Sequence, residues 1–222
     1  MKTRICLCFV TLLILAPLDG VCIASDEEDF QYWNLLNVNL EIDKNWAFSI
    51  EERLSFGNDA KELSYHSSDF GFIYKGLSDS VDLGINFRKV YLRDRRREWK
   101  QEDRPHLNLR LKTKLFGFDV SDRSRLEFRA IEGREDIWRY RNMLMVMVPV
   151  EFAGHKISPF LAEEVFISLN GEEFNKNRLY SGLSFKLSKN MVFETFYLWQ
   201  ASKYGGRWED TNIIGTGLRF FF

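Results

Sequence analysis

One short stretch of the sequence holds side chains that could do nucleophilic chemistry. His66-Ser67-Ser68-Asp69 contains the residue types of a relay in which a histidine takes the proton of a serine hydroxyl. Such a pair occurs in outer-membrane phospholipase and lipid A deacylase barrels. Neighbouring residues of a strand point to opposite faces, so His66 could pair with Ser68 but not with Ser67. No nucleophile-elbow motif surrounds either serine, and a polar cluster at a loop edge is the simpler interpretation.

The sequence gives less support for a metal-binding site or a phosphate-binding loop. The only histidines, His66, His106 and His155, have no paired ligand spacing. There is no glycine-rich phosphate loop, and Gly205-Gly206 is typical of a turn. The sequence therefore predicts neither a metal ion nor a cofactor.

The most distinctive chemical feature is a series of charged residues that alternate with apolar ones. Its members are Glu51, Arg53, Arg88, Arg110, Lys112, Lys114, Arg125, Glu127, Arg129, Arg139, Arg141, Arg178, Lys186, Glu194 and Arg219. On strands, this alternation places the charges on one face and the apolar residues on the other. The function of the chain therefore depends on what that charged face lines.

The elements that must position these charges are strands. Between His106 and Leu115, leucines occupy one parity and polar or basic residues the other. A helix would separate Leu107 and Leu109 by about 200° and destroy the leucine face, whereas a strand preserves it. Eleven such segments of about ten residues follow one another, as in an up-and-down antiparallel transmembrane β-barrel of about 10–12 strands. The fold prediction is all-β.

The predicted connections alternate in length. Short ones lie at 43–45, 76–79, 117–121, 153–156 and 188–190, and longer polar ones at 57–62, 93–104, 132–136, 169–177 and 201–210. Outer-membrane barrels show this alternation, with short periplasmic turns and long external loops. The basic run Arg93–Lys100 would lie in one external loop, where it could meet lipopolysaccharide phosphates or simply be solvated.

Both ends of the chain indicate export. Residues 1–24 have the charged, apolar and small-residue layout of a cleaved secretory signal, with a retained anchor or acylation of Cys22 as alternatives. Removing them takes two of 31 basic and one of 32 acidic residues, which leaves 29 and 31, a net charge of −2 over the single domain 25–222. Near-balanced charge argues against nucleic acid as a partner. Cleavage also removes Cys6, Cys8 and Cys22, so no disulfide is expected.

The last strand ends in Phe222 and resembles the recognition signal of outer-membrane proteins. It predicts insertion by the barrel assembly machinery. Aromatic residues near strand ends, including Trp46, Trp138 and Trp199, fit the girdles at the two membrane interfaces. We therefore expect location in the bacterial outer membrane, with its lipids and lipopolysaccharide as partners.

Several motifs resemble one family of predicted outer-membrane proteins. They are Trp33, Glu51-Glu52-Arg53-Leu54, Trp138-Arg139-Tyr140-Arg141, Pro159 with Glu163-Glu164, Arg178-Leu179-Tyr180 and the terminal aromatic residue. The family is the domain of unknown function DUF2490, and the resemblance covers nearly all of 25–222. It implies a membrane barrel and gives no activity. The parity of Met143, Met145 and Met147 departs from the polar inner face expected there.

Three functions remain open. The first is a non-enzymatic outer-membrane barrel, either a structural protein closed by paired Arg and Glu or a narrow anion-favouring channel; its lumen residues of functional weight are predicted to be Arg110, Arg129, Arg141 and Glu164. The second is an outer-membrane lipid-modifying enzyme. The third is a soluble periplasmic lipid-binding barrel, whose apolar face would point inward.

Four features fit a simple barrel poorly. Bacterial single-chain barrels normally have even strand counts, not eleven. Glu52 and Lys89 have the apolar parity, and the adjacent Glu163 and Glu164 cannot both face inward. A β-bulge or a position at the membrane edge would relieve these conflicts. Pro159 predicts an irregular start to its strand.

Overall fold

The computed structural model describes residues 29–94, 96–152, 155–171 and 173–222. The predicted secretory signal, residues 1–24, lies outside the described residues. Within them, no helix has the length and apolarity needed to cross a membrane.

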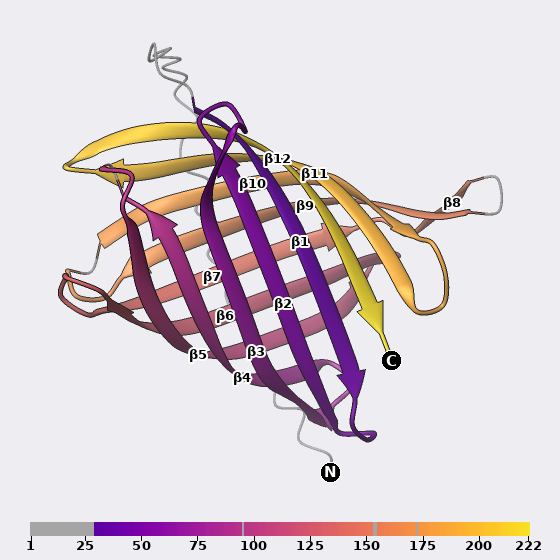
Figure 1. The fold of residues 1–222 in the computed structure, drawn as a ribbon. Helices are drawn as coiled ribbons and strands as arrows, with labels where there is room; N and C mark the ends of the chain where they lie inside the picture. The colour runs from indigo at the N-terminus through magenta and orange to yellow at the C-terminus, as the bar shows by residue number, and fades with distance from the viewer. Residues whose placement is uncertain (1–28, 95, 153–154, 172) are drawn as a thin grey trace.

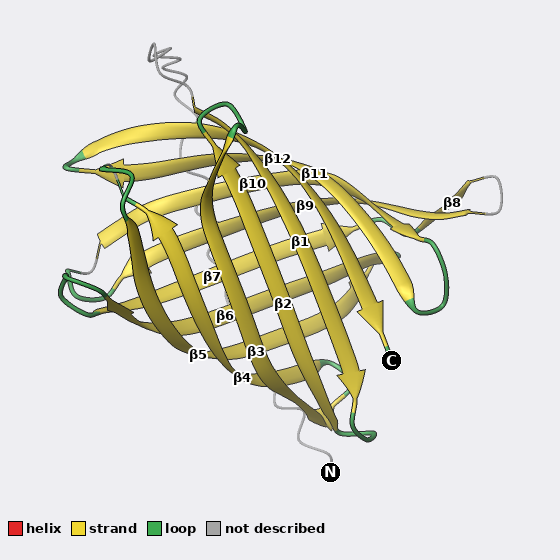
Figure 2. Cartoon of the chain, viewed as in Figure 1, coloured by secondary structure: helices red, strands yellow, loops and turns green. Residues whose placement is uncertain are grey.

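The described chain is all-β, as predicted, and is built from strands joined by short connections (Figure 2). The strands are β1 (Asp29–Glu41), β2 (Trp46–Gly57), β3 (Glu62–Ser78), β4 (Val81–Arg93), β5 (Trp99–Leu115), β6 (Phe118–Ile131), β7 (Ile137–Met147), β8 (Val150–Phe152), β9 (His155–Ser168), β10 (Glu173–Lys186), β11 (Met191–Tyr204) and β12 (Arg207–Phe221).

Eleven of these strands close into a barrel in the order β1 to β7 followed by β9 to β12 (Figure 1). Every neighbouring pair is antiparallel except β1 and β12, which pair in parallel from Asp29 with Thr211 to Asn39 with Phe221. An up-and-down chain of odd strand number has its first and last strands pointing the same way, so it can close only through a parallel pair. The parallel pairing of β1 with β12 therefore lets a barrel of eleven strands close. β8 pairs only with the start of β9 and extends from the wall.

The barrel has a polar inside and an apolar outside. On β5, Arg104 and His106 are 6% and 3% exposed, whereas their neighbour Leu107 is 55% exposed. On other strands, Ile85 and Leu161 are also outward and largely exposed. A soluble barrel has the opposite arrangement, because water then covers its outer face. The alternation identified in the sequence is therefore that of a barrel whose apolar face points outward.

Two charged residues of the apolar parity do face outward, and pairing rather than a bulge accommodates them. The Glu52 carboxylate accepts a hydrogen bond from the Ser68 hydroxyl at 2.8 Å and contacts His66 Nε2 at 2.9 Å. Lys89 Nζ lies 2.7 Å from the Asp103 carboxylate. The strand register is continuous at Glu52 and at Lys89, so no bulge occurs at either position.

Ordinary strand alternation places the adjacent Glu163 and Glu164 on opposite faces of β9. Glu164 points inward and is 1% exposed, while Glu163 points outward and accepts a hydrogen bond from Asn177 Nδ2 at 3.1 Å. Pro159 lies within β9, where the strand changes partners from β8, which reaches Ile157, to β7, which begins pairing at Phe160. A proline, which lacks a backbone donor, is tolerated at such a gap between ladders.

The predicted long connection 132–136 is confirmed, whereas others are shorter than expected. The predicted loop 93–104 reduces to 94–98, and 201–210 is a hairpin that turns at Gly205 and Gly206 with φ of 55° and 85°. Positive φ at both central residues suits glycine and the twist of a two-residue hairpin. The prediction was wrong because strand ends such as Trp99–Arg104 carry mostly polar residues on both faces, which hides the alternation.

Candidate functional site

The inward face of β5, β6, β7 and β9 holds three carboxylates that are almost completely buried. Glu102 and Glu164 are 1% exposed and Glu127 is 0% exposed. An isolated carboxylate in such a position would lose most of its hydration, so burial requires paired cations and further hydrogen bonds. Arginines from neighbouring strands supply both.

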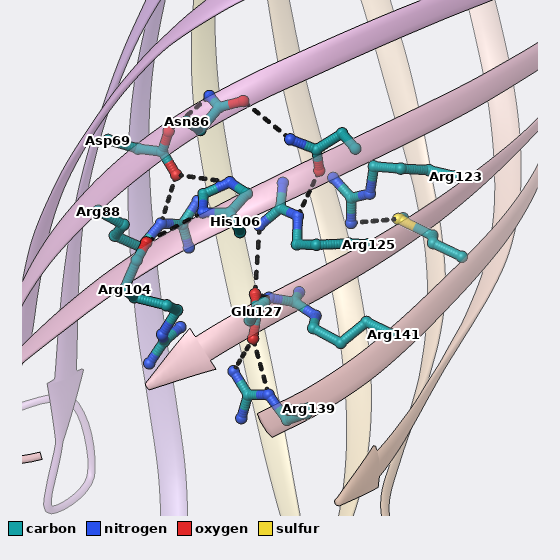
Figure 3. A network of polar contacts seen from close by, with 12 residues as sticks. Asp69, Asn86, Arg88, Arg104, His106, Arg123, Arg125, Glu127, Arg139 and Arg141 are labelled. Atoms are coloured by element: carbon teal, nitrogen blue, oxygen red, sulfur yellow. Dashed lines mark hydrogen bonds and ion pairs between the residues drawn. The ribbon is translucent and has the colours of Figure 1, made fainter. Parts of the chain in front are cut away.

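Glu127 lies at the centre of this cluster (Figure 3). One oxygen is 2.7 Å from Arg141 Nη1 and 3.5 Å from Arg125 Nη1. The other oxygen accepts hydrogen bonds from Nε of Arg139, at 2.7 Å, and from Nη2 of the same side chain. Three guanidinium groups from β6 and β7 therefore converge on one carboxylate. Charge-assisted bonds of this kind are stronger than neutral ones.

Glu164 connects β9 to the same cluster. Its Oε1 accepts hydrogen bonds from Arg141 at 2.6 Å and from Arg123 at 2.7 Å, and its Oε2 contacts Arg178 at 3.4 Å. The Tyr180 hydroxyl donates to Oε2 at 3.3 Å. Because Arg141 binds both Glu127 and Glu164, the two carboxylates belong to one continuous network.

Two further buried carboxylates, on β3 and β5, lie beside this network and have arginine partners of their own. Glu102 is bound by Arg129 at 2.7 Å and 2.9 Å and by Arg104 at 2.8 Å. Asp69 accepts hydrogen bonds from Arg88 at 2.7 Å and from Asn86 at 2.8 Å, and lies 3.5 Å from His106 Nε2. We name the inward carboxylates Asp69, Glu102, Glu127 and Glu164, with the arginines that bind them, the packed charge layer.

The opposite wall of the interior carries a small apolar cluster. Trp33, Leu198 and Ile213 form a buried cluster on β1, β11 and β12. The guanidinium carbon of Arg53 lies 3.7 Å from the ring centroid of Trp33, and that of Arg178 lies 4.9 Å from it. Aromatic faces attract such cations. The charge layer thus packs against aromatic side chains across the barrel.

The structure brings together two of the four predicted lumen residues. Arg141 and Glu164 are in direct contact, at 2.6 Å. Arg129 also faces inward and belongs to the same layer through Glu102. Arg110 faces inward but stands apart from these three, nearer the end of β5. Their functional weight stays a prediction.

Four members of the cluster, Glu102, Arg104, Asp69 and Arg123, were not predicted from the sequence. Glu102 and Arg104 fell in the segment predicted as a loop. Both share the parity of His106 and Arg110, and this parity could have identified them. Asp69 was considered only as a member of the run His66-Ser67-Ser68-Asp69.

The structure does not assemble the serine–histidine relay that was considered as the alternative to a polar cluster. Ser68 and His66 both bind the Glu52 carboxylate, at 2.8 Å and 2.9 Å, so the carboxylate lies between them. In a nucleophilic relay the histidine lies between the serine and the acid. In the described part of the chain, no group of three or more His, Cys, Asp or Glu residues could hold a metal ion.

An apolar outer face, a polar filled interior and tilted antiparallel strands define the class of transmembrane β-barrels. The chain belongs to the family described as "Protein of unknown function (DUF2490)", whose model matches residues 30–211. The family resemblance drawn from the sequence is thus confirmed.

Solved structures show the same fold. The β domain of the Bordetella autotransporter BrkA matches with a TM-score of 0.50 and 9% identity, over 82% of this chain and 86% of that one. LpxR from Salmonella typhimurium matches with a TM-score of 0.51 and 8% identity, over 84% and 87%. At these identities the likeness concerns the fold alone. No curated protein matches the chain significantly.

Proposed function

We propose that this protein is a bacterial outer-membrane β-barrel whose lumen is closed by the packed charge layer, and that it acts as a structural component of the envelope rather than as an open channel. The apolar outer face supports the membrane location, because outward side chains such as Ile85, Leu107 and Leu161 need a nonpolar solvent. The predicted signal peptide and the terminal Phe222 agree with export to that membrane.

The burial of Glu102, Glu127 and Glu164 supports the closed lumen most directly. A water-filled channel would hydrate inward carboxylates, yet the exposed fraction of these three side chains is at most 1%. Each is also bound by at least two arginines. Side chains from several strands therefore occupy the space that ions would have to cross.

Membrane location is tested by fractionation and gel mobility. We expect the protein to stay in the outer-membrane pellet after a carbonate wash and to migrate faster unboiled than boiled. Recovery in the soluble periplasm without a mobility shift would refute the membrane barrel and favour a lipid-binding carrier instead.

Closure of the lumen is tested by conductance in planar bilayers. The wild-type protein should give no stable current steps, whereas Arg141→Ala combined with Arg178→Ala should open a path, because both side chains cross from the wall to Glu164. Lys89→Ala is the matched control, since Lys89 points outward and pairs with Asp103. Regular current steps in the wild-type protein would establish a pore and exclude the closed lumen.

A further inference from the structure

Arginines face each other at several places on the inward side of the barrel. Arg125 and Arg141 are directly opposed on β6 and β7, and Glu127 bridges them. Arg88 and Arg104 are opposed on β4 and β5, and each has its own carboxylate partner. Like charges directly opposite on neighbouring strands repel, so each pair requires an anion. In these two pairs the protein provides it.

Arg110 and Arg123 form a third opposed pair, in which, among the described residues, only Arg123 has a carboxylate partner. They face each other on β5 and β6. Arg123 binds Glu164 through Nη2 at 2.7 Å, while its Nε is buried without a hydrogen-bond partner. Asp82 faces Arg110, but its carboxylate binds Lys112 at 2.8 Å. Among the residues that the structure describes, Arg110 has neither an ion pair nor a side-chain hydrogen bond.

The surroundings of Arg110 are cationic and accessible. Arg123 and Arg219 lie within electrostatic range of it, together with Asp82 and Glu51. The side chain of Arg219 is 42% exposed, compared with 8% for Arg141 in the packed charge layer. Arg110 itself is exposed although it points inward. The lumen is thus filled at the level of the layer and more open toward the end of the barrel that carries the C-terminus.

We propose that Arg110 and Arg123, with Lys112 and Arg219 around them, bind a small oxyanion of the phosphate type that enters from the C-terminal end of the barrel. Guanidinium groups present paired donors that match the oxygens of phosphate. Among the described residues, Arg110 offers a complete unpaired set of donors, and Arg123 adds a second positive charge directly opposite it. The anion takes the position that Glu127 occupies between Arg125 and Arg141.

This site rests on the proposed function. If the lumen is closed by the packed charge layer, this end of the barrel is a recess with one opening, in which an anion can bind but not pass through. The phosphate could belong to a soluble metabolite or to a lipid headgroup that reaches the mouth of the barrel. Both present the same oxyanion to the arginines, so the experiment has to separate the two sources.

The test is calorimetric titration of the refolded protein with inorganic pyrophosphate in a neutral detergent. We expect saturable binding at one site. Arg110→Gln should weaken it by about tenfold or more, because hydrogen bonds to charged groups are among the strongest in proteins. The matched control is Lys114→Gln, on the same strand and face, where Lys114 pairs with Asp119 and is 80% exposed. Its affinity should stay within about twofold of the wild type.

Several outcomes are decisive. No binding by the wild-type protein, or equal affinity in Arg110→Gln, overturns the site. Because Arg110→Gln removes a repulsive charge, the variant should still fold and show the gel mobility shift. Loss of that shift would reveal misfolding independently of the binding measurement.

The two sources of phosphate are separated by repeating the titration in phosphatidylcholine nanodiscs with and without phosphatidylglycerol. A lipid headgroup that reaches the site competes with pyrophosphate, whereas a soluble ligand gives equal affinity in both kinds of nanodisc. Arg110-dependent binding together with channel conductance would refute the closed lumen and leave the site standing.

Discussion

Replacing Glu127 by Gln should be among the most damaging conservative changes in this protein. The carboxylate is 0% exposed and is shared by Arg125, Arg139 and Arg141. Removing one partner of a buried ion pair costs about 3–5 kcal/mol, because the remaining charge is left buried and uncompensated. The amide keeps one acceptor oxygen, which places the expected loss at about 3 kcal/mol. A domain has a total stability of only about 5–15 kcal/mol.

The loss can be measured by urea unfolding in phosphatidylcholine vesicles, followed by tryptophan emission and gel mobility. The matched control is Glu194→Gln. Glu194 also points inward, but among the described residues it pairs with Arg219 alone, and the two side chains are 19% and 42% exposed. Partly exposed pairs contribute about 0–1 kcal/mol, so this variant should unfold almost like the wild type.

A second substitution tests whether uncompensated arginine charge causes the loss of stability. Adding Arg139→Met to Glu127→Gln removes one of the uncompensated cations and should recover part of the lost stability. If Glu127→Gln and Glu194→Gln unfold at the same urea concentration, the burial of the Glu127 carboxylate among uncompensated arginines is refuted. Water would then hydrate Glu127, and no packed charge layer would close the lumen.

Three further predictions concern the outer face, a turn and the closure of the barrel. Ile85→Arg places a charge on an outward position that is 60% exposed and should cost about 2–4 kcal/mol in vesicles if that position lies near the bilayer midplane; no loss would mean that this face meets water. Gly206→Ala, at φ 85°, should cost about 1 kcal/mol or more in the same assay, because alanine resists positive φ. Asn34→Cys with Thr216→Cys should form a disulfide on mild oxidation, since the parallel register pairs them, whereas Asn34→Cys with Leu218→Cys should not.

Much of the wall could be predicted from the sequence, because strand alternation is a local property. Leu107, Leu109 and Leu111 alternate with His106 and Arg110, and this pattern places the leucines together on one face of the strand whatever the neighbouring strands are. Only the structure shows that this face points outward. Outward pairing of Glu52 with His66 and Ser68 could not be predicted, because it depends on which residues the register places side by side.

The ends of the strands were harder to predict from the sequence than their faces, because alternation is weak at strand ends. Where a strand has polar residues on both faces, as in Trp99–Arg104, the alternation that marks a strand disappears. Glu102 and Arg104 were therefore assigned to a loop and left out of the site. The tertiary structure extends β5 through them because β4 and β6 provide hydrogen-bonding partners on both sides.

The sequence by itself determined the all-β class of fold, the family and which charges share one face of each strand, because these follow from the order and period of residues along one chain. The tertiary structure alone decided the strand count, which face points outward, the parallel closure of β1 with β12 and the partners of each inward charge. The closure and the partners depend on strand register around the whole barrel, which brings Glu164 of β9 to Arg141 of β7 and places Arg110 opposite Arg123.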